Sequence, residues 1–442
     1  MVTIRSTIDL LLRLPDPASN SSPIIATAGR ERQGGNVRNK KLLGGAVALL
    51  SASMLFAGCG SRSEPAASGS AGGAATKVAK IGVIAPLTGD LSVMGLGIKN
   101  SVDLAIRQAN ESNAIPGWKL ELAAEDDTAT PDVGANAATK LAADKDVVGV
   151  VGTLNSGVAQ SVQPILNSAN IVMVSPANTS PNLTQGADLA NPKRTYPNYF
   201  RVCTTDSIQG PFAAQYLFES GVKKLAVVND KKPYGQGLAE AVATKFKELG
   251  GEVVSNQTVN KDDDDFSTVI DLMKAKNPEV VYFGTEFQLA GPMSKQMKDK
   301  GLAVPLMGGD GIFDQKFVDL AGAKSNGDLA TSVGAPIESL ASGKSFVEAY
   351  KAAGFSDGFS AYGAYAYDAA NAIIASLKKS LPSASDASSA RQATIDGMAA
   401  VSFDGATGKV GFDEFGDAIT KTLTVYEVQE LKWVAKKTGE LK

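Results

Sequence analysis

Short apolar runs alternate with amphipathic segments from Val78 onward, and this alternation constrains the fold more than any other feature. A short apolar run favours a buried strand, whereas apolar residues three and four positions apart indicate one face of a helix. Such helical stripes occupy Val102–Ala109 and Leu238–Leu249. The expected strands are Lys80–Pro86, Lys119–Ala124, Val147–Leu154 and Ile171–Ser175, then Lys224–Asn229, Glu252–Gln257, Glu279–Gly284 and Pro305–Gly308.

A strand–helix–strand order implies parallel sheets with helices on both faces. Two runs of four such units therefore predict an α/β protein with two doubly wound lobes. Ligands of open parallel sheets bind at the carboxyl ends of the strands, where helix N-termini present free amides. We accordingly expect a ligand site in the cleft between the lobes.

The N-terminal segment has the order of a secretion signal. The basic stretch Arg38–Lys41 is followed by the apolar stretch Leu42–Ala57 and by Gly58-Cys59, which resembles a bacterial lipobox. We expect residues 1–59 to be an N-terminal extension and lipoprotein signal peptide, with acylation of Cys59 at the mature N-terminus. An ordinary secretory signal cut nearby is the alternative. Residues 60–77, rich in Gly, Ala and Ser, are typical of a flexible tether.

Composition excludes several classes of function. The chain has no histidine, so it lacks the usual general base and the commonest ligand of transition metals. Its two cysteines, Cys59 and Cys203, cannot build a thiolate metal site, and Cys203 is interpreted as an inert buried strand residue. With a net charge of -3, nucleic acid is not an expected partner. We expect neither catalysis nor a cofactor or metal.

Seven stretches, in order and at suitable spacing, resemble the type I periplasmic binding proteins of the branched-chain amino acid class. They are Ile81–Gly89, Val148–Ser156, Ser175–Thr179, Phe200–Gly210, Val228–Gly237, Val281–Gly284 and Met307–Gly311. The resemblance implies two lobes joined by a three-strand hinge, with crossings near Thr205, Val333 and Leu423. The first lobe would then comprise residues 78–204 and 333–422, and the second lobe residues 205–332 and 423–442.

The same resemblance implies which residues hold the carboxylate of an amino acid ligand. Ser156, with main-chain amides at a helix N-terminus, matches the family position that binds the carboxylate. Its alternative role is that of a helix N-cap. The Ala177 carbonyl and the Thr179 hydroxyl match positions that contact the ammonium and carboxylate ends, although Pro176–Pro181 taken alone is simply a turn-rich loop.

Further positions line the cleft by resemblance. Asp206 and Tyr234 match the second-lobe side, but Asp206 can equally cap a helix near Ser207 and Tyr234 can pack beneath its loop. Asp310, between glycines, matches the acidic partner of the ligand ammonium. Tyr362 either reaches the cleft or belongs to the core.

Three departures from the family concern the ligand side chain. Met94 stands where an aromatic residue is frequent, and Glu286 stands where the best-known members carry tyrosine. Asn155 occupies one position of a cysteine pair found in some members. These changes leave contacts to the amino acid backbone intact but argue against a purely aliphatic side-chain pocket.

Together these observations predict the substrate-binding component of an ABC importer. The partners would be an amino acid of branched-chain or related type, the permease subunits of the transporter, and the membrane through the lipid anchor at Cys59. We expect a monomer at the outer face of the bacterial cytoplasmic membrane or in the periplasm. The alternative is a ligand-sensing receptor of the same fold that binds an amide, urea or another small polar solute.

Overall fold

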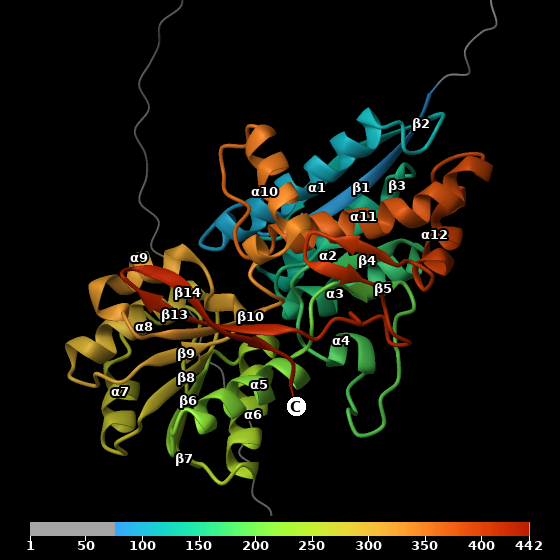
Figure 1. Cartoon of the computed structure of the whole chain (residues 1–442). Helices are drawn as coiled ribbons and strands as arrows, with labels where there is room; N and C mark the ends of the chain where they lie inside the picture. Colours follow the sequence, from blue (N-terminus) through green and yellow to red (C-terminus); the bar gives the residue numbers. More distant parts are fainter. Residues whose placement is uncertain (1–75, 442) are drawn as a thin grey trace, which may run out of the picture. The chain divides into compact units, whose positions relative to one another are not determined.

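The computed structural model describes residues 76–441, and these residues belong to one compact unit. Its first sheet is parallel throughout, with the strand order β2-β1-β3-β4-β5 (Figure 1). These strands are β1 (Lys77–Ala85), β2 (Trp118–Asp126), β3 (Val147–Gly152), β4 (Val172–Ser175) and β5 (Tyr199–Arg201). We call this sheet and its helices the first lobe.

Helices cover both faces of the first sheet. They are α1 (Ser92–Glu111), α2 (Pro131–Ala143), α3 (Ser156–Ser168), the short α4 (Asn182–Gln185), α10 (Ala341–Ala352), α11 (Gly363–Ser380) and α12 (Arg391–Met398). Ile81 and Val102 belong to a cluster on the α1 and α11 side, whereas Ile84 and Val158 belong to a cluster on the α2 and α3 side. Side chains of one strand thus enter two cores, as expected for a sheet covered twice. A small hairpin, β11 (Phe403–Gly405) and β12 (Gly408–Val410), follows α12.

The second sheet, with its helices, forms the second lobe. Its strand order is β14-β13-β10-β9-β8-β6-β7, and β6 to β10 run parallel. The strands are β6 (Lys224–Asn229), β7 (Glu252–Thr258), β8 (Val280–Gly284), β9 (Leu306–Gly308), β10 (Leu329–Val333), β13 (Leu423–Gln429) and β14 (Lys432–Gly439). The helices are α5 (Asp206–Glu219), α6 (Pro233–Glu248), α7 (Ser267–Lys274), α8 (Phe287–Asp299) and α9 (Gln315–Ala321). Single-turn 3-10 helices lie at η1 (Asp310–Ile312), η2 (Gly322–Ser325), η3 (Ile337–Ser339), η4 (Leu381–Ser383) and η5 (Ser388–Ala390).

The eight predicted strands are all present, and the predicted α/β class with two parallel-sheet lobes is confirmed. The sequence analysis did not foresee the antiparallel pair β13 and β14, which extends the second sheet. It also did not foresee the short strand β5 or the strand β10. Cys203 is buried as predicted but lies two residues beyond β5 instead of within a strand.

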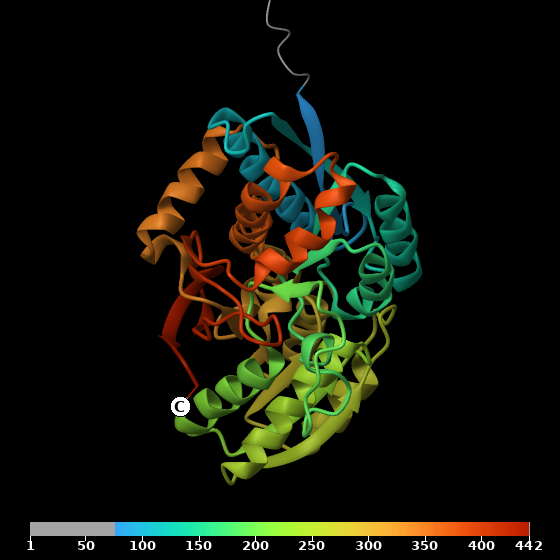
Figure 2. The same ribbon diagram turned by 90° about the vertical axis from the view of Figure 1, so that its right-hand side faces the viewer.

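The chain passes between the sheets three times among the described residues. It leaves the first lobe between β5 and α5, returns between β10 and α10, and leaves again between β12 and β13. In Figure 2 the blue, teal and orange elements of the first lobe again lie together, apart from the yellow elements of the second lobe. No helix within residues 76–441 is long and apolar enough to cross a membrane. The predicted anchor at Cys59 lies outside the described residues.

Candidate functional site

A small cavity, with a volume of about 10 Å³, lies between the two lobes and draws its walls from both. Its lining residues are Met94, Leu154, Asn155, Ser156, Ala177 and Tyr362 from the first lobe, with Tyr234, Glu286 and Gly311 from the second. Most of these residues follow the carboxyl ends of strands: Asn155 comes after β3, Ala177 after β4, and Glu286 after β8. The cavity therefore occupies the place where parallel strands of two facing sheets present their loops.

The structure brings the nine predicted site residues together in two layers. Six of them line the cavity: Met94, Ser156, Ala177, Tyr234, Glu286 and Tyr362. The other three, Thr179, Asp206 and Asp310, are buried and do not line the cavity. Asp310 bonds Tyr234 of the wall, and the Asp206 amide donates to the Thr179 carbonyl oxygen.

Ser156 opens helix α3 at the cavity. Asn155, rather than Ser156, holds the N-cap position, and its side chain makes no capping hydrogen bond. The Ser156 hydroxyl instead accepts a long hydrogen bond of 3.4 Å from the Ser180 amide. A helix N-terminus carries free amides and roughly half a positive charge, so this wall of the cavity suits a carboxylate.

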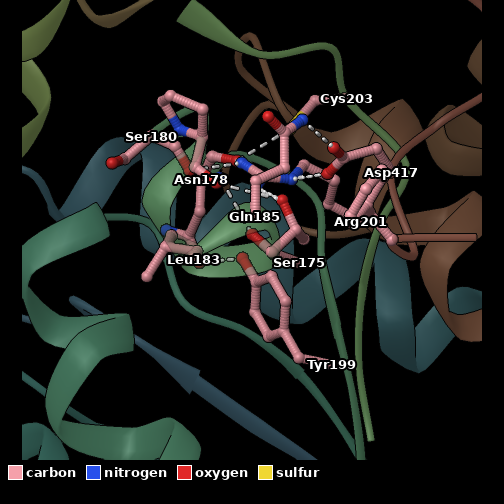
Figure 3. A network of polar contacts seen from close by, with 12 residues as sticks. Ser175, Asn178, Ser180, Leu183, Gln185, Tyr199, Arg201, Cys203 and Asp417 are labelled. Atoms are coloured by element: carbon pink, nitrogen blue, oxygen red, sulfur yellow. Dashed lines mark hydrogen bonds and ion pairs between the residues drawn. The ribbon is translucent and has the colours of Figure 1, made fainter. Parts of the chain in front are cut away.

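The loop after β4, Ser175–Ser180, is held by Arg201 at the end of β5 (Figure 3). The fully buried Arg201 donates hydrogen bonds to the carbonyl oxygens of Asn178 (2.7 Å) and Ser180 (2.9 Å). Its Nε lies 2.7 Å from Asp417 Oδ1, which comes from the segment between β12 and β13. The other guanidinium nitrogens of Arg201 donate hydrogen bonds to Asn178, Ser180 and Thr184, and a buried ion pair that also makes charge-assisted hydrogen bonds fixes geometry. The loop that carries Ala177 and Thr179 is thus tied to two of the segments that connect the lobes.

Asp310 sits at the centre of a hydrogen-bond network below the cavity. Its Oδ1 accepts from the Tyr234 hydroxyl (2.8 Å) and from Gln209 Nε2 (2.9 Å), and its Oδ2 accepts from the Tyr362 hydroxyl (2.9 Å). Burial raises the pKa of Asp310, although these three donors favour its ionised form. Tyr234 and Tyr362 consequently do two things, since they line the cavity and orient this carboxyl.

The glycines on either side of Asp310 have a packing reason. A Cβ at Gly309 would lie 2.6 Å from the Tyr234 hydroxyl oxygen, and one at Gly311 would lie 2.9 Å from Tyr234 Cε1. Any larger residue would push the tyrosine ring away. The backbone of this loop therefore approaches Tyr234 closely.

Asp206 has the opposite environment from Asp310. It is the first residue of α5 and is 2% exposed, and neither of its carboxylate oxygens has a hydrogen-bond partner in the described part of the chain. Thr205 is the N-cap, so Asp206 does not cap the helix. Burial raises the pKa of Asp206 to about 8, and the nearby charge of Asp310 adds to the rise. The Thr179 hydroxyl lies near this carboxyl but not in hydrogen-bond geometry, and it too has no partner within residues 76–441.

Among residues 76–441, three hydrogen bonds between side chains cross from the first lobe to the second, and each ends on a carboxylate. Asn155 Nδ2 donates to Glu286 Oε1 (2.7 Å), the Tyr362 hydroxyl donates to Asp310 Oδ2 (2.9 Å), and the Ser360 hydroxyl donates to Asp314 Oδ2 (2.5 Å). We call these three bonds the cross-lobe bonds. They show that the lobes are closed on one another around the cavity.

Comparison with known proteins agrees with this architecture. Residues 78–437 match the periplasmic binding protein family. The chain belongs to this family. A curated relative, the Leu/Ile/Val-binding protein BraC3 of Rhizobium johnstonii, is 32% identical over 356 residues, which cover 80% of this chain and 93% of the relative.

Two solved structures of binding proteins are also similar. One is the leucine-binding protein LivK of Thermotoga maritima, at 26% identity and a TM-score of 0.71, covering 81% of this chain and 98% of the other. The second is the branched-chain amino acid transporter substrate-binding protein LivJ of Streptococcus pneumoniae in complex with isoleucine, at 26% identity and a TM-score of 0.72, covering 82% and 100%.

Within this periplasmic binding protein, the sequence analysis missed residues that act behind or across the cavity. Lys232, whose Nζ lies 2.9 Å from Glu286 Oε2, precedes the predicted Tyr234 by two positions. Gln209 orients Asp310, and Ser360 bonds Asp314. Only Lys232 and Gln209 fall inside stretches that carried the resemblance. Asn155 had been noted as a departure from the family but not as part of the site.

Proposed function

We propose that this binding protein is the extracytoplasmic substrate-binding component of an ABC importer and that it takes an amino acid zwitterion into the cavity between its lobes. The observation that carries the proposal is a pair of opposite environments, one at the cavity wall and one at a buried residue whose amide bonds the loop that carries Ala177. The N-terminus of α3 at Ser156 suits an anion, whereas the unpartnered carboxyl of Asp206 suits a cation. The relatives named for Leu, Ile and Val, and the one holding isoleucine, support the same class of ligand.

The ligand carboxylate would lie against the first turn of α3 and the Ser156 hydroxyl. The Ser175–Ser180 loop, held by Arg201, would contribute Ala177 and the Thr179 hydroxyl. Hydrogen bonds of this kind to an ionised group are about twice as strong as those between neutral groups. Since this grip uses groups that every α-amino acid shares, it would fix the ligand backbone without selecting the side chain.

The ligand ammonium would be balanced by Asp206 together with Asp310. Asp310 is already oriented by Tyr234, Tyr362 and Gln209, but Asp206 has both oxygens available for a new donor. An ammonium near Asp206 would favour the ionised carboxylate and lower its pKa from about 8. The buried, unpaired acid thus gains a partner only when the ligand is present.

Transport would follow from the closure of the lobes. The cavity draws on both lobes, so a bound ligand stabilises the closed form in proportion to the contacts it makes with each. The permease would then recognise the closed form, and the proposed acyl anchor at Cys59 with the tether 60–77 would hold the protein at the membrane. No step of this cycle requires catalysis by the chain, and we expect it to act as a monomer.

The test is a thermal-shift screen with the twenty L-amino acids, urea and short amides, followed by calorimetric titration. A ligand at 100 times its dissociation constant should stabilise the protein by about 2.7 kcal/mol. Analogues of the best ligand that lack either the carboxylate or the ammonium should not bind. Binding of urea or amides without any amino acid would contradict the proposal and favour a sensor of small polar solutes.

A further inference from the structure

One corner of the cavity is polar, although the family relatives are named for aliphatic ligands. It consists of Asn155, Glu286 and Lys232, which we call the polar corner. Asn155 and Glu286 line the cavity and are 8% and 4% exposed. Glu286 accepts from Asn155 Nδ2 at 2.7 Å through Oε1 and from Lys232 Nζ at 2.9 Å through Oε2.

The oxygen of the Asn155 amide, Oδ1, takes no part in the hydrogen bond to Glu286. Asn155 Oδ1 is buried, and no donor among the residues that the structure describes reaches it. The orientation of the amide follows from its neighbour, because a flip would place Oδ1 against the carboxylate oxygen of Glu286. A buried acceptor without a donor costs about 1–3 kcal/mol, so native structures seldom keep one without a reason.

The charges of the polar corner indicate which kind of ligand group could donate a hydrogen bond to Asn155 Oδ1. Lys232 lies 2.9 Å from Glu286 and 3.5 Å from Asp230, so one ammonium group already serves two carboxyl groups. An acidic side chain of a ligand would be repelled there. The ligand ammonium has a separate place at Asp206 in the function proposed above, which leaves the side-chain end of the ligand to meet the corner.

The remaining wall limits the size and shape of that side chain. Met94, Leu154 and Tyr362 present apolar surface to this small cavity. Once the lobes part to admit a ligand, such a wall suits a short side chain with a methyl or methylene group and one polar end. A long cationic side chain would have to displace the cross-lobe bond between Asn155 and Glu286.

We propose that this subsite selects amino acids whose short side chain ends in a neutral hydrogen-bond donor, a hydroxyl or a carboxamide, over their hydrocarbon isosteres. A carboxamide, with two N–H groups, would bond Asn155 Oδ1 in the first lobe and a free lone pair of Glu286 in the second, so it would strengthen closure as well as selectivity. A hydroxyl, with one O–H group, would bond Asn155 Oδ1. A site with a built-in partner for a polar group discriminates strongly against analogues that lack the group, since the partner is then left unpaired. This inference rests on the proposed binding of amino acids.

The test compares isosteric ligands by calorimetric titration of the wild-type protein. Threonine is matched with valine, and asparagine with leucine. At least one polar member should bind ten or more times tighter than its hydrocarbon partner, which corresponds to about 1.4 kcal/mol. Aspartate, which has the shape of asparagine without its donor, should bind at least ten times more weakly than asparagine.

Two variants assign the effect to Asn155. Asn155→Leu removes the acceptor and should abolish the preference or reverse it, with folding checked by the melting temperature without ligand. Asn256→Leu, at an exposed position of β7, is the control and should keep all affinities. A threonine preference that survives Asn155→Leu would overturn the assignment.

The outcomes also separate this inference from the function on which it rests. If valine and leucine bind wild type as tightly as threonine and asparagine, the selectivity is wrong but the amino acid site stands. If no amino acid binds at all, both proposals fail. No variant is needed for this comparison, so a folding defect in Asn155→Leu cannot obscure it.

Discussion

Replacing Asp206 by asparagine should make the ligand-free protein more stable and the binding site worse. Burial raises the pKa of Asp206 from 3.8 to about 8, so the folded state holds a proton that the unfolded state releases over most of this range. The sign follows from the raised pKa. The stability that comes with this proton is fully present below about pH 4 and is lost as the pH rises through about 8.

The magnitude follows from about 1.36 kcal/mol for each pKa unit of difference. At pH 5 the raised pKa lowers the free energy of unfolding by roughly 2 kcal/mol relative to a side chain that never ionises. At pH 8 it lowers this free energy by roughly 5 kcal/mol. Asp206→Asn removes this dependence. The free-energy gap between variant and wild type should therefore widen by about 3 kcal/mol from pH 5 to pH 8, whatever the fixed effect of the new amide.

Urea unfolding of both proteins without ligand, at several pH values between 5 and 8, measures this gap. Asp127→Asn is a matched control, because Asp127 is also buried, with a pKa raised to about 7, but lies in the turn after β2 and outside the cavity. The control should show a widening of the same sign and unchanged ligand affinity. A constant gap between wild type and Asp206→Asn would refute the buried, protonated acid.

The same carboxyl should report ligand binding. At pH 7 a group with a pKa of about 8 is about 0.9 protonated, so an ammonium that ionises it would release close to one proton. Calorimetric titration in buffers of different ionisation enthalpy counts this proton. Wild type should release it, whereas Asp206→Asn should release none and bind at least ten times more weakly. Equal affinity in the two proteins would place the ammonium elsewhere.

Other predictions concern the anchor, the second acid and the loop. Cys59→Ser should move the protein from the membrane fraction to the soluble fraction, and retention in the membrane pellet would contradict the anchor. Asp310→Asn should weaken amino acid binding by more than about tenfold in a titration while the apo melting temperature stays near that of wild type. Asp417→Asn leaves the buried Arg201 without its counter-charge and should cost about 3–5 kcal/mol in urea unfolding; a loss under 1 kcal/mol would contradict the role of the pair.

Much of the fold was predictable because strand and helix periods are local properties of the sequence. The strands β6 and β7 begin where the apolar runs predicted, and β6 also ends there. The sequence analysis did not predict the antiparallel strands β13 and β14, because no helix alternates with them. β13 pairs with β10 across roughly a hundred residues of chain, and such pairing has no local signature, whereas β14 joins the sheet by pairing with β13.

The candidate site likewise has residues that the sequence predicts and contacts that it does not. Ser156, Ala177 and Glu286 follow strands, and parallel strands bring their ends together, so these positions could be predicted from order alone. The partners across the cavity could not. That Asn155 meets Glu286, or Ser360 meets Asp314, depends on how the lobes face each other, and no spacing in the sequence encodes that distance. Asp206 was predicted as a site residue, but its missing partners are a property of the packed structure.

The cross-lobe bonds have a consequence for the speed of capture. A solute enters the cavity only when the lobes part, and parting breaks the bonds of Asn155, Tyr362 and Ser360 to their carboxylates. Opening is then a first-order step that precedes diffusion of the solute into the site. At low solute concentration the encounter limits the rate, but at high concentration the rate levels off at the frequency of opening. The hydrogen bonds that hold the lobes together thus also set an upper limit on how often the protein can load.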